Sequence, residues 1–371
     1  MLEKTMSKEN PNAFKLVINS AIVKKYFKET ALTKKEIQKI AKDIDSLELR
    51  QRVQLIAYEL KKVLPDDFSV ALSKLLQITR KQNLESFELW PATEFIQIYG
   101  LNHIEKSLTA MYELTQKFTA EFSIRPFINK YGAEIYEKLE AWKHDENEHI
   151  RRWLSEGTRP RLPWGEKLQL AVENPSYGLE ILEHLKFDPS LYVRKSVANH
   201  LNDIAKDHPT IVVQTLIRWK KQVPENYQKE FQFITNRALR TLIKNGNTDA
   251  LKFSGIETNN NSINQSELKI NKTKFKMGDI LEMTFLITNT SKKRIKFIVD
   301  FVIYFQKANG QLKPKVFKLK NGFLESKQQL SIAKKYAFRP ITTRKFHSGI
   351  HHLTIKLNGI ESKRLKFELN T

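Results

Sequence analysis

From residue 12 to residue 252, apolar side chains recur at helical spacing. The segment LELRQRVQLIAYELKKVL (47–64) places an apolar residue every three or four positions and stops before a proline, as an amphipathic helix does. Thr33 comes just before another such segment and is a predicted N-cap. Pro126 interrupts a later run near Glu121, where we expect one helix to end or kink. The pattern predicts a helical body.

After residue 265 the period of the pattern changes to two. Six segments alternate apolar and polar residues as strands do, namely 280–288, 294–305, 312–320, 329–338, 351–357 and 363–369. The dipeptides Asn309-Gly310, Asn321-Gly322 and Asn358-Gly359 are tight-turn signals between or after these segments. About seven short strands in a segment of this length are typical of an immunoglobulin-like sandwich.

An internal repeat runs through the helical region. Asp145 lies six residues before Arg151, Asp188 lies six residues before Arg194, and the two arginines are 43 residues apart. Arg237 follows after another 43 residues, without an equivalent aspartate. A period of about 40–47 residues with a pair of helices in each unit is typical of HEAT repeats, which stack into a curved solenoid with a concave face. An alternative for each Asp and Arg is structural, with Asp capping a helix and Arg pairing between repeats.

The two patterns together define the expected organisation of the chain. The polar stretch TNNNSINQ (258–265) has the composition of a linker. We therefore expect a mainly α protein in which a HEAT-like α-solenoid precedes an all-β immunoglobulin-like sandwich, with the helical domain over 1–257, the linker over 258–265 and the sandwich over 266–371.

The net charge of +22 is concentrated in the predicted sandwich. Residues 266–371 hold 23 Lys and Arg against 7 Asp and Glu, a net charge of +16, whereas residues 1–265 hold 40 against 34. A field of this kind attracts polyanions, and counterion release then supplies affinity for nucleic acid. A surface that is charged only for solubility is the alternative, but it does not require the excess to lie in one domain.

Several classes of chemistry are disfavoured by composition. The chain has no cysteine, so disulfides, thiolate catalysis and cysteine-ligated metals are excluded. His351 and His352 beside His347 form the only histidine group in the sequence, and chance placement in a strand explains it better than a metal site. No apolar run reaches the roughly 18 residues of a membrane span, and no signal-peptide core is present. We expect a cytoplasmic protein that works at the bacterial nucleoid, without a membrane, a metal or another cofactor.

The stretch WKHDENEHIRRWLSEGTRPRLPW (142–164) carries the densest candidate chemistry. It places Glu156 among four arginines and ends on Trp164, and the arginines are Arg151, Arg152, Arg159 and Arg161. A guanidinium offers a fixed fork of donors to paired phosphate oxygens, which makes arginine clusters typical of phosphate binding. Such a surface gains nothing from a carboxylate unless the carboxylate has another task. A salt-bridged helix end is the alternative.

Taken together, these features resemble the HEAT-repeat DNA alkylation-repair glycosylases, in the AlkC branch that carries an additional immunoglobulin-like domain. The resemblance covers nearly the whole chain and is most specific in FTAEFSIRPFI, HIRRWLSEGTRPRLPW and DPSLYVRKSVANHLND. It implies a monofunctional glycosylase activity on alkylated double-stranded DNA: hydrolysis of the N-glycosidic bond of 3-methyladenine and 3-methylcytosine without base flipping. We expect the protein to act as a monomer.

The resemblance also implies roles for particular residues. Its motifs give catalytic roles to Glu121, Glu156 and Asp203, because a cationic base leaves readily and the reaction needs negative charge near C1′ and a positioned water. Trp164 is expected to face the sugar of the lesion. The alternatives are an ordinary surface acid for Glu121, a cap or bridge for Asp203 and core packing for Trp164.

The same motifs assign four arginines to DNA phosphates, namely Arg152, Arg159, Arg161 and Arg194. Phosphate contacts position a duplex but carry no sequence information, which suits an enzyme that acts in any sequence. For Arg194, pairing between repeats is the stronger alternative.

Two other functions compete with this one. HEAT solenoids are often non-catalytic scaffolds that hold nucleic acid or protein, and a nuclease is the second alternative. Cleavage of a phosphodiester commonly uses divalent metals held by clustered carboxylates, and the sequence contains no such cluster.

Overall fold

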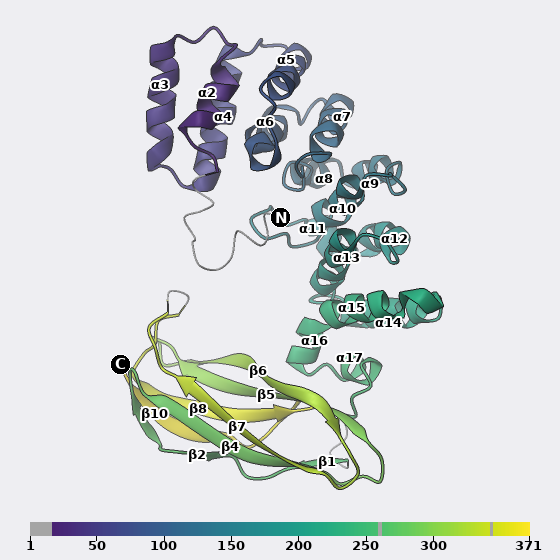
Figure 1. Cartoon of the computed structure of the whole chain (residues 1–371), viewed down its shortest axis with the longest axis vertical. Coiled ribbons are helices and arrows are strands. Elements are labelled where there is room, and N and C mark those ends of the chain that lie inside the picture. Colours follow the sequence, from purple (N-terminus) through teal and green to yellow (C-terminus); the bar gives the residue numbers. More distant parts are fainter. Residues whose placement is uncertain (1–16, 259–261, 342–343) are drawn as a thin grey trace. The chain divides into compact units, whose positions relative to one another are not determined.

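The computed structural model describes residues 17–258, 262–341 and 344–371 (Figure 1). Residues 12–16, where the predicted helical region begins, lie outside this part. The chain divides into two compact units. The first comprises the residues up to Asp207 together with Val223–Ile234, and the second comprises His208–Gln222 together with Thr235–Thr371.

Helices that follow one another along the chain build the first unit (Figure 1). They are α2 (Ser20–Phe27), α3 (Lys34–Asp43), α4 (Leu49–Val63), α5 (Phe68–Lys81), α6 (Trp90–Tyr99), α7 (Ile104–Thr115), α8 (Arg125–Tyr131), α9 (Ala133–Glu140), α10 (Glu148–Gly157), α11 (Gln169–Glu173), α12 (Ser176–Leu185) and α13 (Leu191–Ile204). Helices from successive repeats pack on each other, as α4 does on α6 and α10 on α13. The predicted HEAT-like solenoid is confirmed.

Local signals set where several helices begin. Thr33 is the N-cap of α3 and forms a capping box with Glu36, as its position in the sequence predicted. The predicted break near Pro126 is also present, because α7 ends at Thr115 and Pro126 lies in the first turn of α8. Glu121 therefore lies in the connection between these two helices.

The 43-residue repeat corresponds to a repeated hydrogen-bond pattern. Arg151 donates to the carbonyls of Asp145 and Glu146, and Arg194 donates to the equivalent carbonyls of Asp188 and Pro189. Arg151 also forms a bidentate ion pair with Asp188, with N–O distances of 2.6 and 3.1 Å. This arrangement confirms the pairing between repeats for Asp188, since its carboxylate links one repeat to the next, but the N-cap of α13 is Ser190 and not Asp188.

The second unit combines three helices with the sandwich. The helices are α14 (Pro209–Lys220), α16 (Arg240–Asn245) and α17 (Thr248–Phe253), and α15 (Gln228–Ala238) contributes to both units. The strands are β1 (Ile263–Gln265), β2 (Lys269–Ile270), β3 (Lys274–Lys276), β4 (Ile280–Asn289), β5 (Ile295–Gln306), β6 (Leu312–Leu324), β7 (Gln329–Ala337), β8 (Gly349–Leu357), β9 (Ile360–Glu361) and β10 (Leu365–Asn370).

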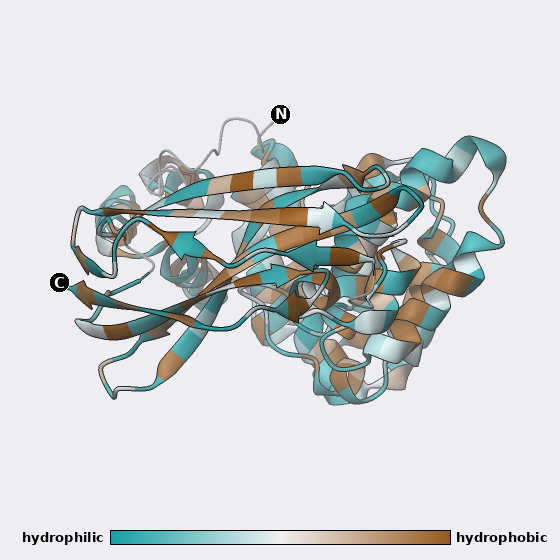
Figure 2. Cartoon of the chain, turned by 90° about the horizontal axis from the view of Figure 1, so that it is seen from below, coloured by the Kyte–Doolittle hydropathy of each residue, from teal (hydrophilic) through white to brown (hydrophobic). Residues whose placement is uncertain are grey.

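The strands form two sheets. One sheet has the order β3-β10-β8-β5-β6, with β9 paired to β8, and all its neighbours are antiparallel except β3 and β10. In the other sheet β4 pairs with β1, β2 and β7. Apolar and polar residues alternate along the strands (Figure 2), so that Leu281, Met283, Phe285 and Ile287 of β4 are all buried. The predicted immunoglobulin-like sandwich is confirmed.

One predicted turn is wrong. Asn358-Gly359 does form the tight turn between β8 and β9, with both residues at positive φ. Asn321-Gly322, by contrast, lies inside β6 and pairs with Ile298 and Phe297 of β5. A dipeptide signal is local, and the long register with β5 overrides it here.

The sandwich begins earlier than the linker prediction placed it. Residues 259–261 of the predicted linker lie outside the described residues, but β1 falls within its last part and pairs with β4. Helices α16 and α17 are also joined to the sandwich. Lys356 donates to the carbonyl of Lys244 at 3.0 Å, and Asn358 donates to that of Glu257 at 3.0 Å. The end of the helical region and the sandwich therefore form one compact unit.

Candidate active site

Helix α10 carries the centre of the candidate site. Asn147 caps its N-terminus by accepting from the backbone N–H of His149 at 2.8 Å. Arg152 and Glu156 are four residues apart, and this spacing places them on the same face of the helix. Helix α10 packs against α13, which brings Ser196 and Asp203 beside that face.

The predicted carboxylates and two of the predicted arginines form one row of alternating charge. Arg152 bonds to Glu121 and also lies 3.8 Å from Glu156. Glu156 is in turn paired with Arg159. The row contains, in spatial order, Glu121, Arg152, Glu156, Arg159, Asp203 and Lys206.

Asp203 completes this row from helix α13. Its Oδ2 accepts from Nε and Nη2 of Arg159 at 2.8 and 2.7 Å, and its Oδ1 accepts from Lys206 at 2.7 Å. Asp203 therefore does bridge to a neighbour, as the alternative reading stated, but it also joins the predicted site. We call the six side chains from Glu121 to Lys206 the charge row.

The carboxylates of the charge row are buried, which strengthens their interactions with the neighbouring cations. The side chains of Glu121, Glu156 and Asp203 are 10%, 8% and 3% exposed, and the paired cations compensate the cost of removing them from water. Ser196 adds a hydrogen bond to Oε2 of Glu156 at 2.5 Å.

The two glutamates differ in proton affinity. Burial raises the pKa of Glu121, and the negative charge of Glu156 raises it further, against the lowering by Arg152. Burial also acts to raise the pKa of Glu156, but Arg152, Arg159 and Ser196 outweigh it, so that this pKa lies below its ordinary value. Glu156 is therefore held ionised, whereas Glu121 takes up a proton more readily.

Arg152 and Arg159 have partners other than those predicted. Their side chains are 15% and 8% exposed, and both guanidinium groups are occupied by carboxylates. This geometry favours a role in holding carboxylates over the predicted contacts with phosphates. A dense run of arginines looks the same in sequence in either case.

The other two predicted arginines are paired with groups outside the charge row. Arg161 forms a bidentate pair with Asp207 and keeps 31% of its side chain exposed. Arg194 donates to two carbonyls of the turn before α13, which is the structural arrangement described above. Arg161 is thus more exposed than Arg152 and Arg159, which fits a phosphate contact better.

Trp164 is not a core residue. It is 62% exposed and has a φ of +67°, a backbone conformation that is uncommon for residues other than glycine. Its carbonyl accepts a hydrogen bond from Arg50 of α4 at 3.1 Å. The alternative of plain core packing is therefore wrong, because most of the ring surface is accessible.

Sequence reasoning did not single out several residues that build this site. Ser196 bonds to Glu156, Arg125 donates to backbone carbonyls of the segment that carries Trp164, and the ring of Tyr192 lies 5.1 Å from the guanidinium of Arg152. His200 is buried beside them and its pKa falls to about 3, so it is neutral. Arg125 and Tyr192 lie inside the quoted motifs, but no local pattern marks them.

No metal site or membrane segment is found in the part of the chain that the structure describes. Nowhere in residues 17–258, 262–341 and 344–371 do three or more Asp, Glu or His side chains gather as metal ligands would. Among the described helices, none has both the length and the apolar character of a membrane span.

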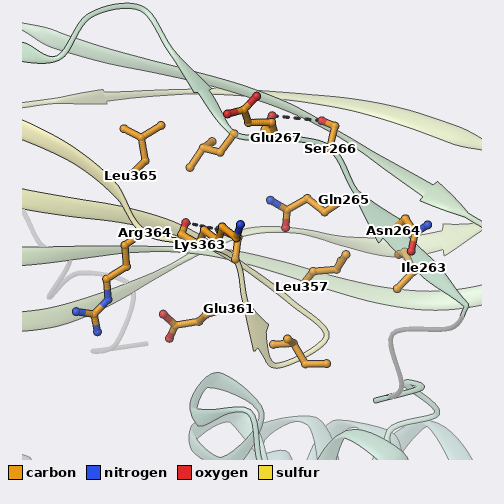
Figure 3. Close-up of a pocket in the computed structure, with 13 residues that line it drawn as sticks. Ile263, Asn264, Gln265, Ser266, Glu267, Leu357, Glu361, Lys363, Arg364 and Leu365 are labelled. Atoms are coloured by element: carbon orange, nitrogen blue, oxygen red, sulfur yellow. Dashed lines mark hydrogen bonds between the residues drawn. The ribbon is translucent and has the colours of Figure 1, made fainter.

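Several cavities lie in the second unit, among them two that are lined by strands of the sandwich and by no residue of the charge row. One has a volume of about 720 Å³ and lies between the segment 263–268 and the segment 357–365 (Figure 3). The carboxylate of Glu361 in its wall is already bonded to the hydroxyls of Tyr304 and Thr354. The second cavity, of about 560 Å³, is basic: Arg240, Lys244, Lys296 and Lys318 line it together with Asp300.

Both parts of the chain are similar to known proteins. Residues 264–371 match the family model of the C-terminal Ig-like domain of the uncharacterised protein YhaZ. YhaZ of Bacillus subtilis (strain 168) is 37% identical over 329 residues, which are 88% of this chain and 89% of YhaZ.

A solved structure is similar over almost the full length. It is the alkylpurine DNA glycosylase AlkC of Pseudomonas fluorescens, bound to DNA containing an abasic site analog. The two chains are 31% identical, and the match covers 96% of this chain and 99% of AlkC with a TM-score of 0.85. The chain belongs to the AlkC branch of the HEAT-repeat AlkC/AlkD family.

Proposed function

We propose that this protein is a DNA glycosylase for alkylation damage, and that it hydrolyses the N-glycosidic bond of cationic N3-methylated bases, 3-methyladenine and 3-methylcytosine, in duplex DNA. The charge row carries the proposal, because it holds three buried carboxylates in fixed positions. The similarity to AlkC over both domains supports the reaction class. The base stays in the duplex in this proposal, as the family resemblance implies.

The chemistry of the substrate explains why carboxylates suffice. An N3-methylated base carries a formal positive charge and leaves as a neutral molecule, so no general acid is needed. Breaking the bond leaves an oxocarbenium-like sugar that must be stabilised by negative charge and attacked by water. Fixed carboxylates supply both functions without reorganisation during the reaction.

The environments of the two glutamates suggest a division of labour. Glu156 has a lowered pKa and two guanidinium partners, so it stays negative and stabilises the developing charge at C1′. Glu121 has a raised pKa, which makes it the better proton acceptor, and it receives the proton of the attacking water. Asp203 acts through Arg159, whose guanidinium it orients.

Trp164 and the sandwich provide the contacts with DNA in this proposal. The exposed indole ring meets the lesion's sugar, where an electron-rich face attracts a cationic group. Arg161, three residues before Trp164, is partly exposed and contacts a phosphate in this proposal. The basic sandwich adds a second contact with the backbone of the duplex, and the cavity lined by Arg240 and Lys244 of α16 and by Lys318 of β6 offers positive side chains for it.

Direct measurement of released bases tests this function. Purified protein is incubated with methylated duplex DNA, and the free bases are separated by chromatography and quantified. We expect release of 3-methyladenine and 3-methylcytosine above the buffer background, with no strand cleavage and with the same rate in EDTA. Release equal to that in buffer, combined with DNA binding, would instead support a non-catalytic scaffold, and EDTA-sensitive strand cleavage would support a nuclease.

A further inference from the structure

The segment 157–166, which carries Trp164 and which we call the Trp164 loop, is held from inside by one arginine. Arg125 is the first residue of α8 and is completely buried. Its guanidinium donates to four carbonyls of the loop, those of Glu166 at 2.5 Å, Arg159 at 2.8 Å, Gly157 at 2.9 Å and Pro160 at 3.4 Å. These bonds reach both ends of the loop and thereby fix its width.

Arginine is suited to this task and lysine is not. A guanidinium has five N–H donors in a rigid plane, whereas an ammonium has three on a flexible stem. Burial lowers the pKa of Arg125 to about 10, so the side chain stays protonated at neutral pH and the carbonyls receive charge-assisted hydrogen bonds.

The backbone of the loop also lies directly on this arginine. A Cβ atom added at Gly165 would lie 3.0 Å from Cδ and 3.1 Å from Nε of Arg125, closer than ordinary packing allows. Glycine at position 165 therefore permits the approach. The loop and Arg125 are fitted to each other rather than loosely in contact.

The backbone of Trp164 has an unusual conformation in this loop. Its φ of +67° is left-handed, although its side chain is 62% exposed and gains little from burial. Two hydrogen bonds hold the backbone at this point. Arg50 donates to its carbonyl at 3.1 Å, and the N–H of Gly165 donates to the carbonyl of Leu162 at 3.1 Å.

We propose that Arg125 and Arg50 are positioning residues that hold the Trp164 loop, so that Trp164 stays exposed in a conformation the chain does not adopt by itself. Arg125 sets the frame of the loop, and Arg50 fixes the carbonyl of the tryptophan from a different helix. This inference rests on the proposed function in one respect, namely that Trp164 meets the lesion. The ordering of the indole is independent of that function.

The test follows Trp164 itself by ¹⁹F NMR. The full-length protein is labelled with 5-fluorotryptophan, and Trp164→Phe identifies the resonance of this residue. Arg50→Ala and Arg125→Lys are compared with Arg80→Ala, a control that removes an exposed arginine of the same unit. We expect the Trp164 resonance to shift or broaden in the first two variants and to stay unchanged in the control.

Single-turnover base release supplies the second measurement. Misplacing a contact group by about 1 Å costs on the order of 100-fold in rate, so we expect losses of about 10- to 100-fold in the rate of base release by Arg50→Ala and Arg125→Lys. Because Arg50 acts through Trp164, Arg50→Ala should cause no further loss in a Trp164→Phe background.

The outcomes separate this inference from the proposed function. An unchanged Trp164 resonance in Arg50→Ala, or a full additional loss in the Trp164→Phe background, would overturn the positioning role. If the wild type releases no base, the proposed function fails, and the NMR comparison still decides whether the two arginines order the loop. Should Arg125→Lys not fold, the surface variant Arg50→Ala carries the test.

Discussion

At the scale of single residues, each carboxylate of the charge row depends on the cation beside it. A buried carboxylate is costly unless it is paired and hydrogen-bonded, and Glu156 has Arg152, Arg159 and Ser196 for this purpose. Glu121 shares Arg152 with Glu156 and keeps a raised pKa. Two similar side chains thus acquire different proton affinities from their surroundings alone.

This difference predicts the pH dependence of base release. As the pH falls, Glu121 is protonated at a higher pH than an ordinary glutamate because its pKa is raised above 4.5, and a protonated Glu121 cannot accept the proton of water. We expect the single-turnover rate to fall with decreasing pH along an acid limb whose midpoint lies above 4.5.

Glu121→Gln tests the assignment of that limb. Loss of a general base costs about 10²- to 10⁴-fold, and we expect the residual activity to be independent of pH over the same range. Glu137→Gln, on the exposed face of α9, is the matched control and should keep the profile of the wild type. An acid limb that persists at the same pH in Glu121→Gln would assign it to another group.

The sequence shows the composition of the site better than its pairings. The motifs bring Glu121, Glu156 and Asp203 forward, and the structure joins them in one row. The sequence cannot show that Arg152 and Arg159 point at these carboxylates, because partners 31 and 44 residues apart meet only after the helices pack. Trp164 likewise has no sequence signal for its exposure or its positive φ.

At the scale of secondary-structure elements, the repeat explains how the site is held in place. Arg151 and Arg194 each close the turn that precedes their helix, and Arg151 is paired with Asp188 of the next repeat. The periodic spacing predicted this link. The helices α10 and α13, which supply most of the charge row, are therefore joined at their N-termini as well as by their apolar faces.

Removing this link should destabilise the helical unit. Asp188 is 6% exposed, and its carboxylate also accepts from the N–H of Ser190 at 2.8 Å, so Asp188→Ala leaves a mostly buried guanidinium with fewer partners. We expect a loss of about 3 kcal/mol in the free energy of unfolding, measured by urea denaturation of the full chain. Asp188→Asn keeps an acceptor for the N–H of Ser190 and should lose less; equal losses in the two variants would contradict the role of the ion pair.

The sequence predicted the main strands correctly but misplaced one turn. Alternation located β4 to β8 and β10, because one face of each packs into the sandwich core. The turn predicted at Asn321-Gly322 was wrong because the turn signal depends on two residues alone. Strand β6 is held instead by pairing with β5 along most of its length. The register shift at Val299 and Asp300 was not visible in the sequence either.

The register of β6 with β5 also shows how the positive charge of β6 is distributed. Lys313 and Lys315 of β6 pair with Phe305 and Ile303, which belong to the core, whereas Lys318 pairs with the polar Asp300. Directly opposite residues share a face of the sheet, so the lysines of β6 lie on both faces. Lys318 lies on the face of the sheet that lines the basic cavity.

At the scale of the whole molecule, the positive charge of the second unit predicts the salt dependence of DNA binding. Each phosphate contact contributes about 0.9 to the slope of log K against log salt concentration, so Lys244→Gln combined with Lys318→Gln should reduce the slope by about 1.8. Substitutions are preferable to removing the sandwich, because α16 and α17 are bonded to it.

Lys274→Gln is the control for this experiment, since Lys274 is an exposed lysine of β3 outside the basic cavity. Binding to undamaged duplex is measured over a range of salt concentrations for each variant. The slope of log K against log salt concentration could decrease by the same amount per removed charge in the control and in the cavity variants. That result would indicate that the overall positive charge of the unit attracts DNA, without a localised contact at the cavity.

The central claim is that a fixed, ionised Glu156 drives cleavage of the glycosidic bond, and single-turnover release of 3-methyladenine by Glu156→Gln tests it most directly. The substitution keeps the size of the side chain and removes the negative charge. The account predicts that release falls to the buffer background while affinity for duplex DNA stays close to that of the wild type and of Glu137→Gln. Release at the wild-type rate from Glu156→Gln would contradict it.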